Sequence, residues 1–242
     1  MHTAIVTGVS RGLGASLAEA LLGHGYTVLG IGRTHNPALG GERFRFARVD
    51  LAAAGHLDEA LTPELSILAA SKPTSVCLLN NAATAGPVGT LGALTAADVV
   101  ASLAVNLAAV VALTNLFCRI FSDARQPRRV INVSSGAAQT PLAGESLYCV
   151  AKAGMEMLTR ALAVEQTAPH FRAISVRPGV IDTDMQQYAR SQPRELLPCV
   201  DMFREFHSQG RLVPPDVVAA KIVDKLVLGD VEHGRTYSYQ EL

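Results

Sequence analysis

The 242-residue sequence predicts an α/β protein, a doubly wound parallel sheet in a single domain spanning residues 1–242. Two observations predict this class. Short apolar runs alternate with stretches of helical periodicity, and a cluster of glycines separates the first apolar run from the first helical stretch. Strands that alternate with helices form βαβ units whose parallel sheet is covered on both faces. Because such crossovers are right-handed, a Rossmann-like arrangement is expected.

The expected strands are short runs rich in valine, isoleucine, leucine and phenylalanine, mostly bounded by turn-forming residues. The first run, AIVTG, leads into the glycine cluster, the second ends in a glycine–arginine pair, and the fourth, SVCLLNNA, ends in two asparagines. Proline and glycine close the sixth run, FRAISVRPG. In chain order the strands are expected at residues 4–8, 27–33, 44–51, 75–82, 129–135, 171–179 and 236–240.

The expected helices carry alanine and leucine at helical spacing between these strands. They cover residues 14–25, about 55–61, 98–121, about 146–166 and 215–227. From 182 to 215 the alternation stops, and this segment holds Pro193, Pro198, Pro214 and Pro215. An irregular segment of that length inside a compact domain is typical of a lid or a binding loop. We therefore expect a substrate loop at about 182–215.

Composition excludes several classes of function. Lysine plus arginine and aspartate plus glutamate each total 21, so the formal net charge is zero, and aromatic residues make up only 5%. Without a basic run or stacking aromatics, the chain is not expected to bind nucleic acid or a charged membrane surface. The four cysteines are widely spaced and form no CxxC pair. They indicate thiols in a reduced compartment, the cytoplasm, and no metal site is expected.

One segment, Val99 to Cys118, is uncharged over about the thickness of a bilayer. Alanine dominates it, and it contains Ser102, Asn106 and Thr114, so a soluble helix buried on most of its sides is the better interpretation. A strand-like run that begins at Thr3 also argues against a signal peptide. We expect a soluble protein with no membrane association.

The glycine cluster has the pattern Gly8-x-x-x-Gly12-x-Gly14, directly before the first helix. Such a turn allows a diphosphate to approach main-chain N–H groups and the positive end of the helix dipole. The spacing differs from GxGxxG, and tight strand-to-helix turns also use glycines. Its position on the first strand of an alternating chain favours a dinucleotide site. The other residues expected to join this site are Ser10, Arg11 and Leu13.

The end of the second strand indicates which dinucleotide binds. A site that prefers NAD usually has a carboxylate there for the adenosine ribose. This chain has Gly32 followed by Arg33, and Arg11 lies in the glycine turn nearby. Since a guanidinium suits a phosphate ester, we expect NADPH (NADP+), the alternative being a merely solvated arginine. Asp50, followed by Leu51, comes too late for the ribose and is expected to contact adenine or to cap a turn.

Tyr148 and Lys152 are four residues apart in an expected helix, so their side chains lie on one face. An isolated pair of this kind is usually a packed tyrosine beside a lysine whose charged end reaches solvent. A phenol normally loses its proton near pH 10, and an ammonium about 4 Å away favours the phenolate. Read as a functional pair, the two residues predict a tyrosine of lowered pKa that exchanges protons with a substrate.

Together these motifs resemble the short-chain dehydrogenase/reductase family over nearly the whole chain. The glycine pattern, which begins at Thr7, and the Tyr148–Lys152 pair both match that family, and Ala83 replaces the last glycine of its NNAG strand end. The resemblance assigns catalytic positions to Asn106, Ser135, Tyr148 and Lys152. It assigns further cofactor contacts to Asn80, Asn81, Ala82, Pro178, Gly179, Val180 and Thr183, and Tyr148 and Lys152 also belong to this set.

The resemblance implies the reduction of a small-molecule carbonyl compound. Tyr148 would protonate the carbonyl oxygen, Ser135 would orient it, and Lys152 would also hold the nicotinamide ribose. Asn106 would hold a water that links Lys152 to solvent, the alternative being a packed polar residue. Ser134 competes with Ser135, but successive strand side chains point to opposite faces, so only one of them can face the cofactor. The family spacing to the tyrosine selects Ser135.

Within the family, the segments PGVIDTDMQQYAR and GRLVPPDVVAAKIV resemble the sepiapterin reductase branch, which includes bacterial reductases of aromatic diketones. Ser238 stands near the position of the aspartate that anchors the pterin there, and Glu241 is the nearest carboxylate. Large apolar side chains in the expected loop suit a flat ketone. These are Tyr188, Leu196, Leu197, Met202, Phe203 and Phe206. We therefore expect an aromatic or alkyl 1,2-diketone of the benzil type as substrate.

Three alternatives remain: a pterin reductase, a non-catalytic dinucleotide-sensing regulator on the same fold, and a scaffolding protein. A regulator should have lost the serine, the tyrosine or the lysine, and this chain has all three. A scaffold predicts no cofactor binding. The helices at 98–121 and around Tyr148 are apolar on more faces than one sheet can cover, so we expect a homodimer or homotetramer through them.

Overall fold

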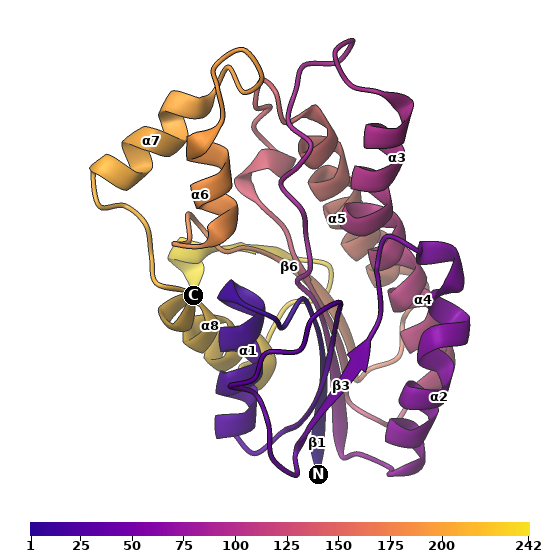
Figure 1. Cartoon of the computed structure of the whole chain (residues 1–242). Helices are drawn as coiled ribbons and strands as arrows, with labels where there is room; N and C mark the ends of the chain where they lie inside the picture. Colours follow the sequence, from indigo (N-terminus) through magenta and orange to yellow (C-terminus); the bar gives the residue numbers. More distant parts are fainter.

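Seven parallel strands form one sheet in the computed structural model, which describes residues 1–242 (Figure 1). The strand order is β3-β2-β1-β4-β5-β6-β7, so the direction of winding reverses between β1 and β4. In such sheets, ligands bind at the carboxyl ends of the strands beside this reversal. The predicted doubly wound fold is confirmed. The strands are β1 His2–Thr7, β2 Thr27–Gly32, β3 Phe44–Arg48, β4 Ser75–Asn80, β5 Arg128–Val133, β6 Phe171–Arg177 and β7 Thr236–Ser238.

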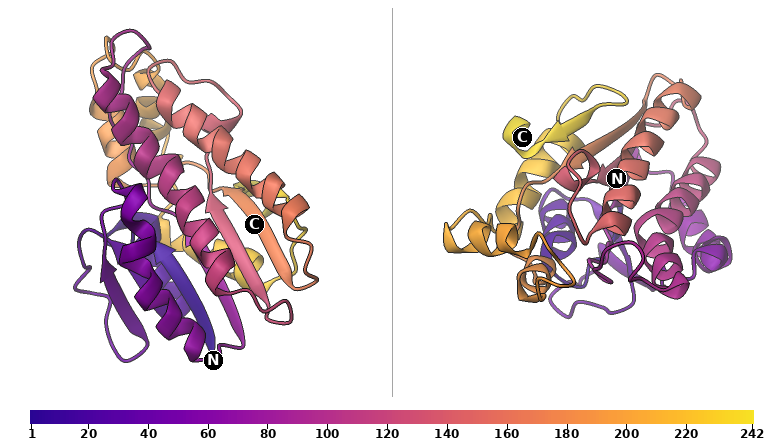
Figure 2. Two further views of the ribbon diagram at one scale, coloured as in Figure 1. Left: turned by 90° about the vertical axis from the view of Figure 1, so that its right-hand side faces the viewer. Right: turned by 90° about the horizontal axis from the view of Figure 1, so that it is seen from above.

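Helices cover both faces of the sheet (Figure 2). One face packs against α1 (Gly12–Gly23) and α8 (Pro215–Ile222), which continues into the π-turn η4 (Val223–Leu228). The other face packs against α2 (Leu57–Ala70), α4 (Ala109–Ile120) and α5 (Ser146–Glu165). Both faces need a cover because the side chains of a strand alternate between them. In β1, Ala4 and Val6 join the core under α1 and α8, and Ile5 joins the core under α2, α4 and α5. The chain also has three short 3-10 turns: η1 Ala54–His56, η3 Gly136–Ala138 and η5 Tyr239–Glu241.

The long apolar helix runs without a break from Ala96 to Ile120. It comprises α3 (Ala96–Leu103), a π-turn η2 (Ala104–Ala108) and α4, and its length and mean hydropathy of 2.1 would allow it to cross a membrane. The expectation that this helix is buried on most sides was wrong, since only 28% of its most apolar window is buried. One side of the helix packs against the rest of the chain, whereas Val100 and Val111 lie outside this contact and are exposed.

The segment expected to be irregular contains two helices, α6 (Asp184–Ser191) and α7 (Val200–Ser208), so that expectation was wrong. Its prolines do not prevent these helices, because Pro193 and Pro198 lie between them. An isolated β-bridge between Ile181 and Val213 joins the two ends of this segment. We call residues 182–212 the lid, which lies beyond the carboxyl ends of the strands (Figure 1). Leu197 in the lid is fully buried against neighbouring apolar side chains.

Candidate active site

The glycine turn between β1 and α1 is tightly packed against the end of β4. A Cβ atom on Gly14 would lie 2.1 Å from the Gly8 carbonyl oxygen and 2.4 Å from Asn81 Nδ2, distances that no side chain tolerates. Gly8 itself has a φ of +76°, which favours glycine. Arg11 occupies the N-cap of α1 without a capping side-chain hydrogen bond. The first N–H groups of α1 are therefore available to an anion.

Thr7 joins the ends of β1 and β4. Its Oγ1 accepts hydrogen bonds from the main-chain N–H groups of Asn81 and Ala82, both at 2.9 Å, and Asn81 Nδ2 donates to the Thr7 carbonyl at 2.9 Å. These bonds hold the predicted NNA segment beside the glycine turn. In the sequence Thr7 stands out only as the first residue of the glycine motif, and its position at the end of a strand before the glycines is the one signal of this role.

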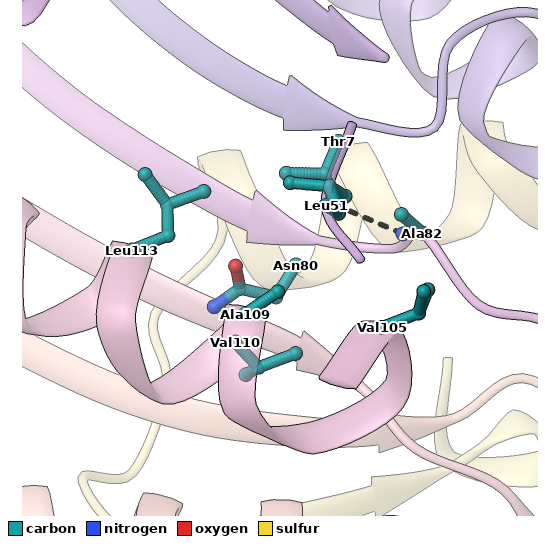
Figure 3. A pocket seen from close by; sticks show the side chains of 8 residues that line it. All are labelled: Thr7, Leu51, Asn80, Ala82, Val105, Ala109, Val110 and Leu113. Atoms are coloured by element: carbon teal, nitrogen blue, oxygen red, sulfur yellow. Dashed lines mark hydrogen bonds between the residues drawn. The ribbon is translucent and has the colours of Figure 1, made fainter. Parts of the chain in front are cut away.

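A small, mostly apolar pocket lies next to this junction (Figure 3). It includes three predicted cofactor contacts, Leu51, Asn80 and Ala82, and side chains of η2 and α4 that were not predicted. The Asn80 amide donates to Thr114 Oγ1 at 3.1 Å and to Asn132 Oδ1 at 2.9 Å, so its donors are engaged inside the protein. The full lining is Thr7, Leu51, Asn80, Ala82, Val105, Ala109, Val110 and Leu113.

The arginines near the predicted phosphate position differ in their partners. Arg33 is exposed at the end of β2 and makes no hydrogen bond or ion pair within the chain. Arg11 instead forms an exposed ion pair with Asp184 at the start of α6, at 2.7 Å. Arg48 was not singled out from the sequence, yet it is exposed and pairs in register with Gly32 on β2. Two exposed guanidinium groups therefore stand at the same edge of the sheet.

The remaining predicted contacts lie around the turn and the start of the lid. Asp50 Oδ1 accepts a hydrogen bond from Ala52 N at 3.0 Å, so it caps a turn, the second of its two expected roles. Ser10 is exposed, whereas the Leu13 side chain is buried in the core. A Cβ atom on Gly12 would lie 3.3 Å from Thr183 Cγ2, so the glycine turn and the lid approach each other here. Pro178, Gly179 and Val180 connect β6 to this part of the lid.

Ser135, Tyr148 and Lys152 come together at the carboxyl edge of the sheet. Lys152 is only 1% exposed, and its Nζ donates to the Val133 carbonyl at 2.7 Å. The same Nζ lies 5.4 Å from the centre of the Tyr148 ring. Ser135 lies next to the phenol, where its hydroxyl acts to lower the pKa of Tyr148. The end of β5 and the first two turns of α5 thus place all three side chains together.

The pKa values in the chain by itself differ from the prediction. Burial raises the pKa of Tyr148 well above its usual value, the Glu145 carboxylate adds to this, and Ser135 opposes it. Burial also lowers the pKa of Lys152 to about 8. The predicted lowering of the tyrosine pKa was therefore wrong for the chain alone, because Lys152 is desolvated and directed at Val133. A neutral phenol is nevertheless the form that can donate a proton.

Ser134 and Ser135, the two residues that follow β5, have different partners. Ser134 is 2% exposed, and its Oγ donates to Glu156 Oε1 on α5 at 2.7 Å. Ser135 follows the end of β5, and its Oγ accepts from Ala137 N at 3.2 Å. The two hydroxyls thus have different surroundings, as the alternation of strand side chains requires.

Asn106 lies in the π-turn η2 and is fully buried. Its Oδ1 accepts from Thr84 N at 2.8 Å, while its Nδ2 donates to Thr84 O at 3.0 Å and to Ser102 Oγ at 3.3 Å. The side chain therefore fixes the loop that follows β4 onto the helix. π-Turns are frequent at functional sites. A water held between Asn106 and Lys152 stays a prediction.

The uncapped helix behind a glycine turn, with a partly buried tyrosine and a buried lysine beside it, defines an oxidoreductase on a Rossmann-like sheet. The sequence model of the short chain dehydrogenase family matches residues 2–194, and the chain belongs to this family. A benzil reductase ((S)-benzoin forming) from Bacillus subtilis is 31% identical over 243 residues, covering 100% of this chain and 99% of the relative. A sepiapterin reductase from Rattus norvegicus is 30% identical, covering 98% of this chain and 96% of the relative. The expected branch of the family is thereby confirmed.

Solved structures agree with this assignment. The KRED1-Pglu enzyme superposes with a TM-score of 0.84 at 25% identity, covering 98% of this chain and 100% of that one. A 3-oxoacyl-[acyl-carrier protein] reductase from Brucella melitensis, solved in complex with NAD, gives a TM-score of 0.80 at 25% identity, covering 98% and 94%. A structural neighbour of this chain thus binds a nicotinamide dinucleotide.

Proposed function

We propose that this protein is an NADPH-dependent carbonyl reductase that reduces one carbonyl of an aromatic or alkyl 1,2-diketone to the hydroxyketone. The observation that carries the proposal is the cluster of Ser135, Tyr148 and Lys152 beside the glycine turn. All three chemical groups are present in one place, which argues against the regulator and scaffold alternatives. The similarity to benzil reductases over the whole chain supports the substrate class.

The residues present fit a nicotinamide dinucleotide. Gly14 has no room for a Cβ atom, which would meet the Gly8 carbonyl and Asn81, and the N-terminus of α1 behind this tight turn has free N–H groups for the diphosphate. Arg33, with Arg48 beside it, offers an unpaired guanidinium for the phosphate of NADPH. Leu51 and Ala82 offer apolar contacts in the adjoining pocket. When bound, the reduced nicotinamide supplies the hydride.

Side chains of the protein supply the proton that the reduction consumes. The neutral Tyr148 phenol donates to the carbonyl oxygen as negative charge develops there, and the Ser135 hydroxyl donates a second hydrogen bond that orients the carbonyl. Lys152, whose pKa is lowered to about 8, can exchange protons close to neutral pH. Its Nζ is also held in place by the Val133 carbonyl, which positions it for the ribose. Asn106 supports this region by fixing the loop at Thr84.

The lid supports a flat, mostly apolar substrate. Tyr188 and Leu196 in the lid are exposed and can contact such a substrate, whereas Leu197 and Val200 are buried in a cluster with Val88 and Ala189. A pterin reductase, the competing alternative, needs a carboxylate near the C-terminus to anchor the pterin. Glu241 is engaged elsewhere, since its oxygens accept from Ser238 N and Oγ, both at 2.7 Å, and from Arg235 Nη2 at 2.8 Å. These bonds lower the pKa of Glu241 to about 2.

The test is kcat/KM for benzil, a short alkyl diketone and sepiapterin, measured side by side with NADPH. We expect the diketones to be reduced much more efficiently than sepiapterin. If sepiapterin leads by about tenfold, roughly 1.4 kcal/mol of transition-state preference, the pterin alternative is correct. A fluorescence titration with NADPH tests cofactor binding. If the fluorescence did not change, the protein would not bind the cofactor, and the scaffold alternative would be supported instead.

We also propose that the protein is a homodimer or homotetramer. Val150, Met157 and Val164 are all more than half exposed and recur every seven residues along α5, which places them on one face. Val100 and Val111 on the neighbouring long helix are exposed as well. An apolar surface of this kind, formed by the two longest helices, fits a second copy of the same surface in a symmetric dimer.

A further inference from the structure

Glu145 is a buried carboxylate that the mechanism above does not use. It occupies the N-cap of α5, three residues before Tyr148, and is only 7% exposed. Its main chain is hydrogen-bonded, because Glu145 N donates to Leu142 O at 3.0 Å and Cys149 N donates to Glu145 O at 2.9 Å. Its carboxylate, by contrast, makes no hydrogen bond or ion pair within the chain, not even a capping bond to the helix. A group buried in this way needs a partner to offset its lost hydration.

The surroundings of Glu145 place it between the catalytic tyrosine and the lid. Glu145 immediately precedes α5, and its carboxylate is close enough to Tyr148 to raise the pKa of the phenol further. On the other side, a Cβ atom on the preceding Gly144 would lie 2.7 Å from the carbonyl oxygen of Leu196 in the lid. The carboxylate also contributes to the raised pKa of Cys199, at the start of α7.

No cation balances this carboxylate. The titratable groups whose pKa values it affects are Tyr148 on α5 and Cys199 on the lid, and both are neutral in their acid forms. Burial alone raises the pKa of Glu145 to about 7, so the neutral acid is well populated at neutral pH. A neutral carboxylic acid, unlike a carboxylate, has one O–H to donate.

We propose that protonated Glu145 donates a hydrogen bond to the second carbonyl oxygen of the 1,2-diketone, while Tyr148 acts on the first. Glu145 is the residue immediately before α5 and Tyr148 is the third residue in it, so the two side chains leave the same end of the helix. Glu145 is then a specificity-determining residue that distinguishes a vicinal diketone from a simple ketone. This inference rests on the proposed function, and it names the contact that selects the substrate.

The experiment compares benzil with deoxybenzoin, which has the same two rings but only one carbonyl. Glu145→Leu removes the donor, whereas Glu145→Gln keeps N–H donors without a titrating proton. We expect Glu145→Leu to lower the ratio of kcat/KM for benzil over deoxybenzoin by about tenfold, the value of one hydrogen bond in an active site. Glu145→Gln should lower that ratio by less than about threefold. NADPH binding serves as the control for folding in both variants.

A pH profile supplies the second readout. The wild-type kcat/KM for benzil should fall as the pH rises through about 7, because deprotonation of Glu145 removes the donor and adds a charge. The Glu145→Gln profile should lack this fall. Equal losses on both ketones in Glu145→Leu would overturn the inference, because Glu145 would then be merely structural. The inference would also be overturned if Glu145→Gln and Glu145→Leu lowered kcat/KM equally and the wild type preferred an aminoketone. Glu145 would then be a carboxylate that binds a cation.

The failure of this inference is distinguishable from the failure of the proposed function. A wild-type enzyme that reduces benzil with an unchanged substrate ratio in both variants retains the function and removes Glu145 from substrate selection. A wild-type enzyme that reduces neither benzil nor deoxybenzoin overturns the proposed function, and the role of Glu145 with it.

Discussion

The carboxylate of Glu156 accepts hydrogen bonds from the Nε and Nη2 atoms of Arg177 at 2.8 and 2.7 Å. The Ser134 hydroxyl donates a third, at 2.7 Å. The ion pair is largely buried, with 11% of the Glu156 side chain and 20% of the Arg177 side chain exposed. It therefore connects α5, one turn after Lys152, to β6, immediately before Pro178. The pair holds the catalytic helix and the start of the lid in fixed relation.

Breaking this pair should destabilise the protein strongly. Glu156→Leu leaves the Arg177 guanidinium without its partner, and we expect a loss of about 3 kcal/mol in the free energy of unfolding, measured with urea. The double variant Glu156→Leu/Arg177→Leu should recover much of this loss, since it leaves no buried charge unpaired. A loss below about 1 kcal/mol in the single variant would show that the pair behaves as an exposed ion pair.

Tyr148→Phe should keep NADPH binding and lose most of the turnover, because the substitution removes the proton donor and leaves the ring in place. A general acid contributes about 10²–10⁴-fold, so kcat for benzil should fall by at least about 100-fold. Tyr26→Phe, at a buried tyrosine beside the start of β2, is the matched control and should retain turnover. Turnover above about a tenth of the wild-type value would exclude Tyr148 from the mechanism.

Arg33→Ala should raise KM for NADPH by about tenfold or more and change KM for NADH by less than about twofold, since only NADPH carries the additional phosphate. The measurement is initial rates with each cofactor at saturating ketone. Arg43→Ala removes the same charge just before β3, at the other end of the strands, and should affect neither cofactor. Equal effects of Arg33→Ala on both cofactors would make Arg33 a merely solvated residue. A wild type that prefers NADH would refute the NADPH assignment.

Glu145 should also make folding stability depend on pH. Its pKa rises from an ordinary 4.5 to about 7 in the folded chain, so between these values the native state binds more protons than the unfolded state. Stability from this group is therefore present at low pH and is lost as the pH rises from about 4.5 to 7. At about 1.4 kcal/mol per pKa unit, the loss amounts to roughly 3 kcal/mol.

Glu145→Gln cannot titrate, so its stability relative to the wild type should increase by roughly 3 kcal/mol between pH 4.5 and pH 8. Urea unfolding of both proteins at the two pH values measures this difference, and other groups cancel in the comparison. A difference that does not change with pH would mean that the carboxyl of Glu145 ionises as freely in the folded protein as in the unfolded chain.

The exposed apolar faces of α4 and α5 should control assembly. Val111→Glu together with Met157→Glu places charges on this surface, and we expect the molar mass from light scattering to fall to that of a smaller species. Ile67→Glu, at an exposed apolar position on α2, is the control and should leave the mass unchanged. An unchanged mass in the double variant would locate the interface elsewhere, and a monomeric wild type would refute the oligomer proposal.

The order of elements was predictable because it depends on local patterns. Apolar runs such as SVCLLNNA mark strands buried on both faces, and the glycines after β1 mark a turn that side chains would obstruct. The Tyr148–Lys152 spacing was equally informative, since any helix places these two residues on one face. The doubly wound class followed from the alternation of strands and helices with right-handed crossovers, whereas the strand order β3-β2-β1-β4-β5-β6-β7 came from the structure.

The sequence did not predict the two lid helices, the exposed face of the Ala96–Ile120 helix or the pKa values at the site. Each of these depends on contacts between segments far apart in the chain. Tyr148 has a raised pKa because the folded protein buries it, and Lys152 is directed at a carbonyl of β5 that the sequence does not place next to it. The sequence did not single out Glu145 either, because a glutamate before a helix is usually a solvated cap. In the folded chain Glu145 is only 7% exposed, and the lid packs against the preceding Gly144. Local periodicity thus determined the elements and the catalytic pair, whereas desolvation, which belongs to the tertiary structure alone, decided the charge of each group in the site.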